Sequence, residues 1–246
     1  MQEEKKQLEI LLMEYFRNNY PDFPRGSVVP SESPDFLLKM KNKHLLGIEL
    51  TRLNPENAKM PDEDQVKEIE FREHLIQFTF DLFQQKNDLN LFVKFRFSET
   101  KSIIKEREMS VAVKAANAIA NVVDGKKGNS FFKESVVNGY LPDGIEEILV
   151  VHHPKMKTSV WERSNNLGIS NDVVDDIRAT IHKKDEKLRL YRKNHLNYYW
   201  LLITTDHLRG VKNINVSNKI MNHRFESSFQ QVFLFDLMKA RIYDLV

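Results

Sequence analysis

Residues 31–53 read SESPDFLLKMKNKHLLGIELTRL, and this stretch decides how the fold is interpreted. Two apolar runs are separated by a short polar link, residues 41–44, which predicts a β-hairpin. Asp35 stands at the start of the first run, and Glu49 lies near the end of the second. Such a hairpin brings two carboxylates together from neighbouring strands, and carboxylate oxygens are ligands that a divalent cation prefers.

The alternation of side chains along each strand sharpens this expectation. Because successive residues of a strand point to opposite faces, Asp35 and Lys39 share one side of the first strand. Glu49 and Thr51 likewise share one side of the second. The turn can place Asp35 and Glu49 on the same side of the sheet. Two carboxylates this close repel each other unless a cation neutralises them, and a bound Mg²⁺ does so while it polarises a phosphate oxygen.

The composition limits the classes of protein to consider. The chain has 246 residues, of which 41% are hydrophobic and 29% are charged, as expected for a globular protein with a core. The formal net charge of +2 gives no global attraction to nucleic acid, so any basic surface is a local patch. The absence of cysteine excludes disulfides and thiolate zinc sites, and it favours a cytoplasmic location.

Neither a signal peptide nor a membrane span is predicted. Residues 1–16 are charged and amphipathic, and they lack the uninterrupted apolar core of a signal peptide. The sequence also lacks the run of about 18 or more apolar residues that a membrane-spanning helix needs. We therefore expect a cytoplasmic protein that has no membrane partner.

Helices and strands alternate along the chain after the opening hairpin. Apolar residues at helical spacing predict helices over residues 3–18, 62–86, 101–123 and 172–193. Alternating or continuous apolar runs predict strands over residues 89–97, 145–152, 198–205, 229–235 and 240–245. Residues 154–170 are expected to form a loop, and Asn171 or Asp172 to cap the helix that follows. This pattern indicates an α/β fold with a mixed central sheet flanked by helices, in a single domain over residues 1–246.

The hairpin resembles the signature of the PD-(D/E)xK nuclease superfamily. Pro34-Asp35, thirteen further residues and then Glu49-Leu50-Thr51 match that signature in order, spacing and hairpin context. The resemblance covers roughly residues 1–100, with the helix over residues 3–18 in the place of the family's first core helix. It implies a restriction-endonuclease-like core with C-terminal elaborations.

The same resemblance implies a metal site and its ligands. In the family, the Asp and the Glu ligate Mg²⁺, and the backbone carbonyl that follows the Glu is often a further ligand. Those roles would fall on Asp35, Glu49 and Leu50, with Mg²⁺ or Mn²⁺ as the cofactor. Glu32 precedes the motif by three residues and could add a ligand or hold a water, although it could equally be a solvated loop carboxylate.

The chain departs from the family at the motif lysine, which Thr51 replaces. In the family that lysine orients or deprotonates the attacking water, or it stabilises the charge that builds on the phosphate. A neutral threonine hydroxyl supplies no positive charge. Either another lysine takes this role, or hydrolysis is weakened or lost.

Three lysines could take the missing role. Lys39 shares its side of the strand with Asp35. Lys184 and Lys187 lie on a predicted helix that leads into the strongest buried strand, as a core helix of this superfamily does. Lys184 falls on the apolar stripe of that helix, where an unpaired lysine is costly. Lys187 precedes Tyr191 by one turn, a spacing found for a polar residue in nucleases with exonuclease-like cores. The alternative for each is a solvated lysine or one whose stem lies on the core.

Other motifs give weaker signals. Glu9 and Glu14 lie on the first predicted helix, where a surface position is the better expectation. His152 and His153 are adjacent on a strand and point to opposite faces, so they cannot both chelate one ion. The sequence contains neither a zinc-hydrolase motif nor a glycine-rich phosphate loop. A basic patch on one helix and the aromatic residues after it suit nucleic acid: Lys183, Lys184, Lys187, Arg189, Arg192, Lys193, Tyr198, Tyr199 and Trp200.

These features predict Mg²⁺-dependent phosphodiester hydrolysis of nucleic acid, with DNA favoured over RNA. The alternative is a catalytically inactive protein of the same fold that binds nucleic acid or a protein partner through its basic helix. A small-molecule site between sheet and helices has no positive feature in its favour. The resemblance also allows a homodimer, because a double-strand cut needs two sites.

Overall fold

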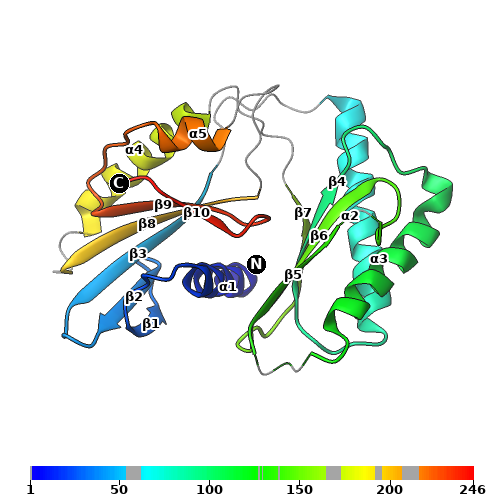
Figure 1. Ribbon diagram of the computed structural model, residues 1–246, viewed down its shortest axis with the longest axis horizontal. Helices are drawn as coiled ribbons and strands as arrows, with labels where there is room; N and C mark the ends of the chain where they lie inside the picture. Colours follow the sequence, from blue (N-terminus) through cyan, green and yellow to red (C-terminus); the bar gives the residue numbers. More distant parts are fainter. Residues whose placement is uncertain are drawn as a thin grey trace. The chain divides into compact units, whose positions relative to one another are not determined.

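The computed structural model describes residues 2–53, 62–126, 128, 130–137, 139–164, 173–191, 196–206 and 216–246 (Figure 1). The chain divides into two compact units. Unit 1 consists of Met1–Leu11 and Met60–Asn166, and unit 2 consists of Leu12–Lys59 and Leu167–Val246. Most of unit 1 is therefore inserted between the two parts of unit 2. The single domain over residues 1–246 stays a prediction.

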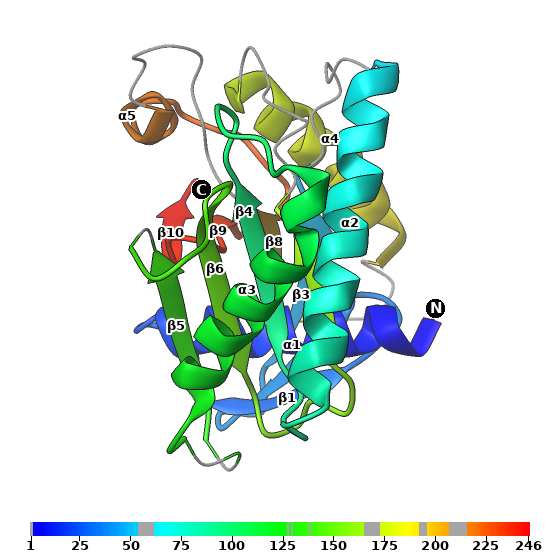
Figure 2. The same cartoon turned by 90° about the vertical axis from the view of Figure 1, so that its right-hand side faces the viewer.

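Unit 1 is built on a four-stranded sheet in the order β5-β6-β4-β7. Helices α2 and α3 lie side by side on one face of this sheet (Figure 2). Three alanines of α3, Ala112, Ala115 and Ala116, are buried and allow close packing. The elements are α2 (Glu63–Gln84), β4 (Phe92–Phe97), η1 (Lys105–Arg107), α3 (Glu108–Val123), β5 (Phe132–Val137), β6 (Ile145–His152) and β7 (Val160–Arg163).

Unit 2 is built on a six-stranded mixed sheet in the order β1-β2-β3-β8-β9-β10. Strands β1, β2 and β3 are antiparallel, β3, β8 and β9 are parallel, and β10 returns antiparallel to β9. The strands are β1 (Gly26–Pro30), β2 (Phe36–Met40), β3 (Leu45–Arg52), β8 (Tyr198–Thr205), β9 (Gln231–Asp236) and β10 (Arg241–Asp244). The helices are α1 (Gln2–Asn19), which begins in unit 1, α4 (Val173–Tyr191) and α5 (Val216–Met221).

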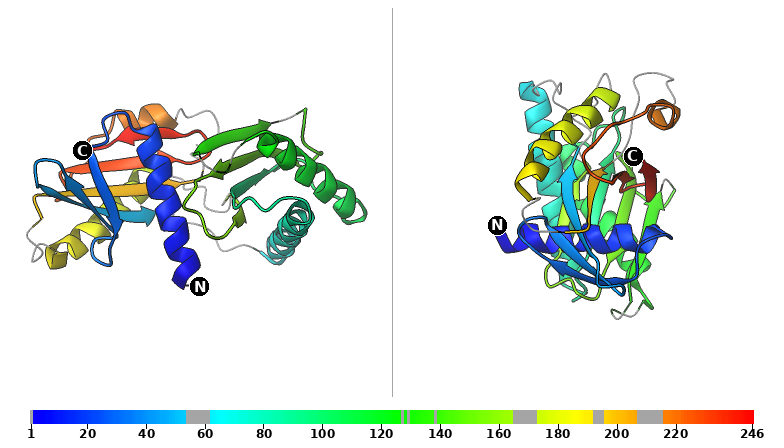
Figure 3. Two further views of the ribbon diagram at one scale, coloured as in Figure 1. Left: turned by 90° about the horizontal axis from the view of Figure 1, so that it is seen from below. Right: turned by 90° about the vertical axis from the view of Figure 1, so that its left-hand side faces the viewer.

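The second half of α1 covers one face of the six-stranded sheet (Figure 3). Tyr15 and Phe16 are fully buried. The ring of Tyr15 lies 4.8 Å from that of Phe235, and the ring of Phe16 lies 5.3 Å from that of Phe233. The Tyr15 hydroxyl donates to the Leu237 carbonyl at 2.7 Å, so this buried polar group is satisfied.

Helix α4 covers the opposite face of the same sheet. Its buried stripe contains Ile177, Ile181 and Leu188, which pack in one cluster with Leu201 and Ile203 of β8. Because side chains alternate along a strand, these two β8 residues point away from the face that α1 covers. The sheet is therefore enclosed by helices on both sides, and residues on the α4 face of β3 are brought toward α4.

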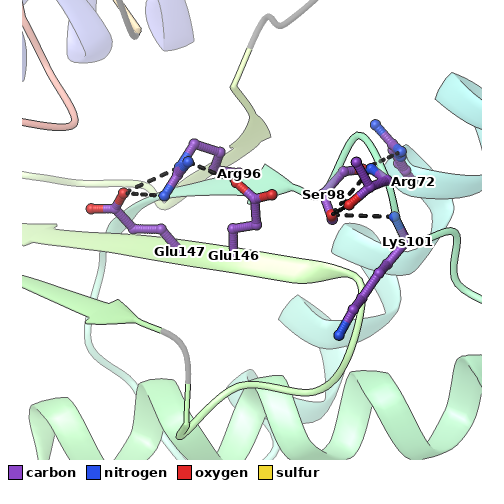
Figure 4. Close-up of polar contacts among 7 residues, drawn as sticks. Arg72, Arg96, Ser98, Lys101, Glu146 and Glu147 are labelled. Atoms are coloured by element: carbon purple, nitrogen blue, oxygen red, sulfur yellow. Dashed lines mark hydrogen bonds and ion pairs between the residues drawn. The ribbon is translucent and has the colours of Figure 1, made fainter.

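Charged side chains on β4 of unit 1 are paired within that unit. Figure 4 shows Arg96 between two glutamates, with 2.7 Å to Glu146 and 3.1 Å from its Nη2 to Glu147. Lys94 is fully buried, and its Nζ lies 2.7 Å from Oε1 of Glu162. Buried charges need such partners. The glutamates of β6 and β7 therefore allow β4 to carry a lysine and an arginine in the interior.

The α/β class with mixed sheets and flanking helices is confirmed. The predicted helices correspond to α1, α2, α3 and α4, although the third begins as the 3₁₀ turn η1. The strands form two sheets and not one, and the expected loop over residues 154–170 contains β7. The sequence of β7, VWER, is four residues long and does not clearly alternate between apolar and polar residues. No local pattern therefore predicted this strand or its pairing with β4. Strands β1 and β5 and helix α5 were also not predicted.

None of the helices in the described parts of the chain is long and apolar enough to cross a membrane.

Candidate functional site

The hairpin predicted from residues 35–51 is formed by β2 and β3. The two strands pair antiparallel, with Phe36 opposite Ile48 and Lys39 opposite Leu45. The same register, continued by one residue beyond the start of β2, sets Asp35 opposite Glu49. Directly opposed residues of an antiparallel pair share one face of the sheet. The two acidic residues therefore occupy facing positions at the edge where β2 begins.

Asp35 is fixed by a backbone donor of β3. The N–H of Leu50 donates to Oδ2 of Asp35 at 2.7 Å, and Asp35 is half-buried. Strand β3 extends beyond the start of β2, so this carboxylate takes the place that a carbonyl of a longer β2 would occupy. The N–H and C=O of one strand residue face the same neighbour. The Leu50 carbonyl therefore also faces the Asp35 side of β3.

Gly47 allows the segment before Asp35 to lie against β3. A Cβ atom at this position would lie 2.6 Å from Cγ of Pro34 and 2.7 Å from Cδ1 of Leu196. Both distances are too short for real side chains, and the proline ring cannot rotate away. The absence of a side chain at Gly47 thus lets Pro34 cover the strand and places Asp35 at its end.

Exchanging Gly47 for alanine should lower the free energy of unfolding by about 1–3 kcal/mol, the usual cost of overpacking. Urea unfolding followed by circular dichroism measures the change. In a Pro34→Ala background, the same exchange should cost less, because one of the two clashing groups is gone. An equal cost in both backgrounds would show that Pro34 does not constrain this position.

Glu49 is paired with a lysine of α4. Its carboxylate Oε1 lies 2.7 Å from Nζ of Lys184. The two side chains are 6% and 13% exposed, so the pair is largely removed from solvent. Removing one partner of a buried ion pair strongly destabilises the fold, because the other charge stays buried without a counterion. Of the three candidate lysines, Lys184 is the one for which the structure shows a contact with a motif carboxylate.

The other two candidate lysines are exposed to solvent. Lys187 lies one turn further along α4, on its exposed side. Lys39 lies on the Asp35 face of β2, opposite Leu45. Leu45 is four residues from Glu49 along β3, which corresponds to about 13 Å at the rise of a strand. Lys39 therefore stands at the far end of the hairpin from the two carboxylates.

Thr51 and Glu32 lie near the carboxylates but differ in exposure. Thr51 is half-buried and shares the α4 face of β3 with Glu49. Its backbone carbonyl accepts a hydrogen bond of 3.3 Å from the Thr204 hydroxyl. Glu32 is exposed in the loop between β1 and β2. Neither residue adds a positive charge to the site.

Two carboxylates of α1 form ion pairs with basic residues of the same helix. Glu9 forms an ion pair of 3.7 Å with Lys5, and Glu14 is buried with Arg17 at 3.8 Å. The half of α1 that contains Glu14 packs on the sheet face opposite to Glu49. The expectation of a surface position does not hold for Glu14, which is 8% exposed because it lies in the buried stretch of the helix.

Three aspartates in unit 2 are buried, which was not expected from the sequence: Asp176, Asp206 and Asp236. Asp206, directly after β8, is 4% exposed and accepts a 2.6 Å hydrogen bond from Nη2 of Arg52. Asp176 is 2% exposed and lies on α4 about two turns before Lys184. The carboxyl ends of parallel strands often carry functional groups, which is the signal that could have indicated Asp206. The position of Asp176 in a first helical turn favoured a surface role instead.

The basic and aromatic patch is only partly described. Lys183 and Lys187 are exposed on α4, whereas Tyr199 and Trp200 belong to the core, as expected. Tyr198 is partly exposed beside His44 at the start of β8. Other predicted members and the predicted helix cap fall outside the described residues or have undescribed side chains: Arg189, Arg192, Lys193, Asn171 and Asp172.

His152 has a structural role in unit 1. Its Nδ1 lies 2.8 Å from the Asn90 carbonyl oxygen, and its Nε2 lies 2.9 Å from the Gly128 carbonyl oxygen. Nδ1 of its neighbour His153 accepts from the Lys155 N–H at 3.2 Å. Both ring nitrogens of His152 face backbone carbonyls, which gives them no role as metal ligands.

The donor set of the hairpin fits a small divalent cation. Within the described residues, no group of three or more His, Cys, Asp or Glu side chains is gathered that could hold a metal ion. Mg²⁺, however, is commonly held by one or two carboxylates, with waters and substrate phosphates completing its shell. Asp35, Glu49 and the Leu50 carbonyl offer such a set of hard oxygen ligands at one edge of the sheet.

Comparison with known proteins does not extend these observations: no family model, no curated protein and no solved structure matches the chain.

Proposed function

We propose that the protein is a Mg²⁺-dependent phosphodiesterase that cleaves nucleic acid, with DNA favoured over RNA. The observation that carries this proposal is the contact of 2.7 Å between the Lys184 ammonium and the Glu49 carboxylate. It supplies a positive charge beside the motif carboxylates, where Thr51 leaves none. This lysine comes from α4 and not from β3. The proposed site therefore contains two carboxylates and an ammonium group, although Thr51 replaces the motif lysine.

The order of elements in unit 2 supports a restriction-endonuclease-like core. Helix α1 precedes three antiparallel strands, and α4 then leads into β8, which is parallel to β3. The resemblance implied a core helix before the hairpin and another that enters a buried strand. In this proposal unit 1 is an insertion between β3 and α4.

The side chains of the site have separate tasks in the proposed reaction. Mg²⁺ held by Asp35, Glu49 and the Leu50 carbonyl would polarise a phosphate oxygen and lower the pKa of a bound water. The Leu50 N–H keeps Asp35 in place. The Lys184 ammonium carries three donors, so it can donate to the attacking water or to a phosphate oxygen.

The burial of the pair strengthens these electrostatic effects. Glu49 and Lys184 are shielded from solvent by α4 and the sheet, and charges interact more strongly there than in water. A donor that is held in position before the reaction stabilises the charge that develops on the phosphate without a further cost of reorganisation. Once the cation has bound, Lys184 is such a donor, because its stem lies on the buried stripe of α4 between Ile181 and Leu188.

Hydrolysis of defined substrates tests the proposal. The purified protein is incubated with supercoiled plasmid and with end-labelled single-stranded DNA and RNA, in Mg²⁺, in Mn²⁺ or in excess chelator. We expect cleavage with either cation and none with chelator, and faster cleavage of DNA than of RNA. A protein that cuts no substrate with either cation contradicts the proposal. Cation-independent binding of labelled DNA without cleavage would favour the catalytically inactive alternative.

A further inference from the structure

Glu49 already has a cation beside it in the form of the Lys184 ammonium, because α4 covers one face of the sheet that contains β3 (Figure 1). We infer that Lys184 competes with the divalent cation for Glu49 and so regulates entry of that cation. In the metal-free protein the lysine neutralises the carboxylate, and binding of the cation displaces it toward the substrate phosphate. This inference rests on the proposed function, because it takes Glu49 as a ligand of the cation.

The burial of Glu49 explains why a resident ammonium is needed. The carboxylate side chain is 6% exposed, and a buried carboxylate without a partner is strongly disfavoured. Lys184 gives it a partner at 2.7 Å before any cation arrives. A divalent cation therefore does not enter an acidic site that is free of positive charge, and it must replace part of an existing ion pair.

Repulsion between the Lys184 ammonium and the divalent cation determines whether Lys184 raises or lowers the affinity for the cation. An ammonium and a divalent cation that share one carboxylate are like charges a few ångströms apart, and each disfavours the other. Asp35 also has a backbone partner, because its Oδ2 accepts from the Leu50 N–H. Removal of the Lys184 charge should therefore increase the affinity of the site for the cation.

The position of Lys184 on α4 keeps the displaced ammonium close to the site. Its neighbours on the buried stripe, Ile181 and Leu188, are 1% and 0% exposed. The aliphatic stem of a lysine packs well against such residues while its charged end turns. Lys187 provides a matched comparison, because it is a lysine on the same helix, three residues away and exposed.

Calorimetric titration with Mn²⁺ alone, without nucleic acid, tests the competition. Lys184→Met and Lys184→Gln should bind Mn²⁺ at least about tenfold more tightly than the wild type, since a neighbouring charge changes such equilibria by about one to three powers of ten. Lys184→Arg, which keeps the charge, and Lys187→Met should bind as the wild type does. Equal or weaker binding by both neutral variants at position 184 would overturn the inference.

A measurement on the unaltered protein covers the case in which the variants do not fold. An amine-reactive label, read by mass spectrometry, reports how accessible each lysine is. Addition of Mn²⁺ should increase labelling of Lys184 and leave that of Lys187 unchanged. Labelling of Lys184 that stays the same or falls would overturn the inference.

The two proposals fail in different ways. A wild-type protein that cuts nothing, while its neutral Lys184 variants gain affinity for Mn²⁺, would refute the hydrolysis and retain the competition. A wild-type protein that cuts DNA, while neither variants nor labelling respond as expected, would refute only the competition.

Discussion

Exchanging Glu49 for glutamine should lower the rate of DNA hydrolysis by about a thousandfold, within the range found for loss of a central electrostatic group. The amide keeps the size of the side chain but loses the negative charge that binds the cation. It also leaves the Lys184 ammonium without its counterion, where only 13% of that side chain is exposed. Single-turnover rates on labelled DNA measure the effect, and calorimetry should show weaker binding of Mn²⁺.

Loss of folding must be separated from loss of chemistry in this variant. Removing one partner of a buried ion pair costs about 3–5 kcal/mol, so the assays belong at a temperature where circular dichroism shows the variant to be folded. Glu186→Gln is the matched control, because Glu186 is exposed on α4. A folded Glu49→Gln variant that retains more than about a tenth of the wild-type rate would rule out Glu49 as a metal ligand.

Exchanging Lys184 for methionine should lower the rate of hydrolysis by about a hundredfold to a thousandfold at saturating Mn²⁺. Methionine keeps an unbranched apolar stem on the stripe of α4 but has no charge to assist the water or the phosphate. Saturating Mn²⁺ is needed because the variant is expected to bind the cation more tightly than the wild type. The rate measured there reports the reaction step and not the occupancy of the site.

Lys187 and Lys39 supply the comparison for this variant. Both are exposed, and Lys39 lies at the far end of the hairpin. Lys187→Met and Lys39→Met should each change the hydrolysis rate by less than about threefold, as surface charges interact weakly. If Lys187→Met lowers the rate more than Lys184→Met does, the role of the missing motif lysine belongs to Lys187.

The acidic half of the candidate site was predictable because it is local. A four-residue link and strand alternation suffice to set Asp35 opposite Glu49, and the register of β2 and β3 agrees with that expectation. Lys184 was predictable only as a candidate. Its place on an apolar stripe indicated that it needs a partner, but the partner lies 135 residues away in the sequence. That contact depends on how α4 packs on the sheet, which no local sequence pattern predicts.

Other features had no signal in short stretches of sequence. The division into two sheets depends on which strands pair with each other, and the edge strands β1 and β7 are only four or five residues long. The burial of Asp206 follows from its contact with Arg52, which adjacent parallel strands create. The exposure of Lys39 and Lys187 likewise depends on which faces of β2 and α4 are covered by other elements. These properties arise from tertiary packing and not from local propensity.

The insertion of unit 1 separates the two halves of the candidate site along the chain. During synthesis the ribosome releases Asp35 and Glu49 first, then the whole of unit 1, and only afterwards the helix that carries Lys184. A growing polypeptide therefore holds the acidic residues without their ammonium until α4 has been synthesised. Under the proposed function, a product that ends before α4 lacks the ammonium of Lys184 and cannot carry out the full reaction.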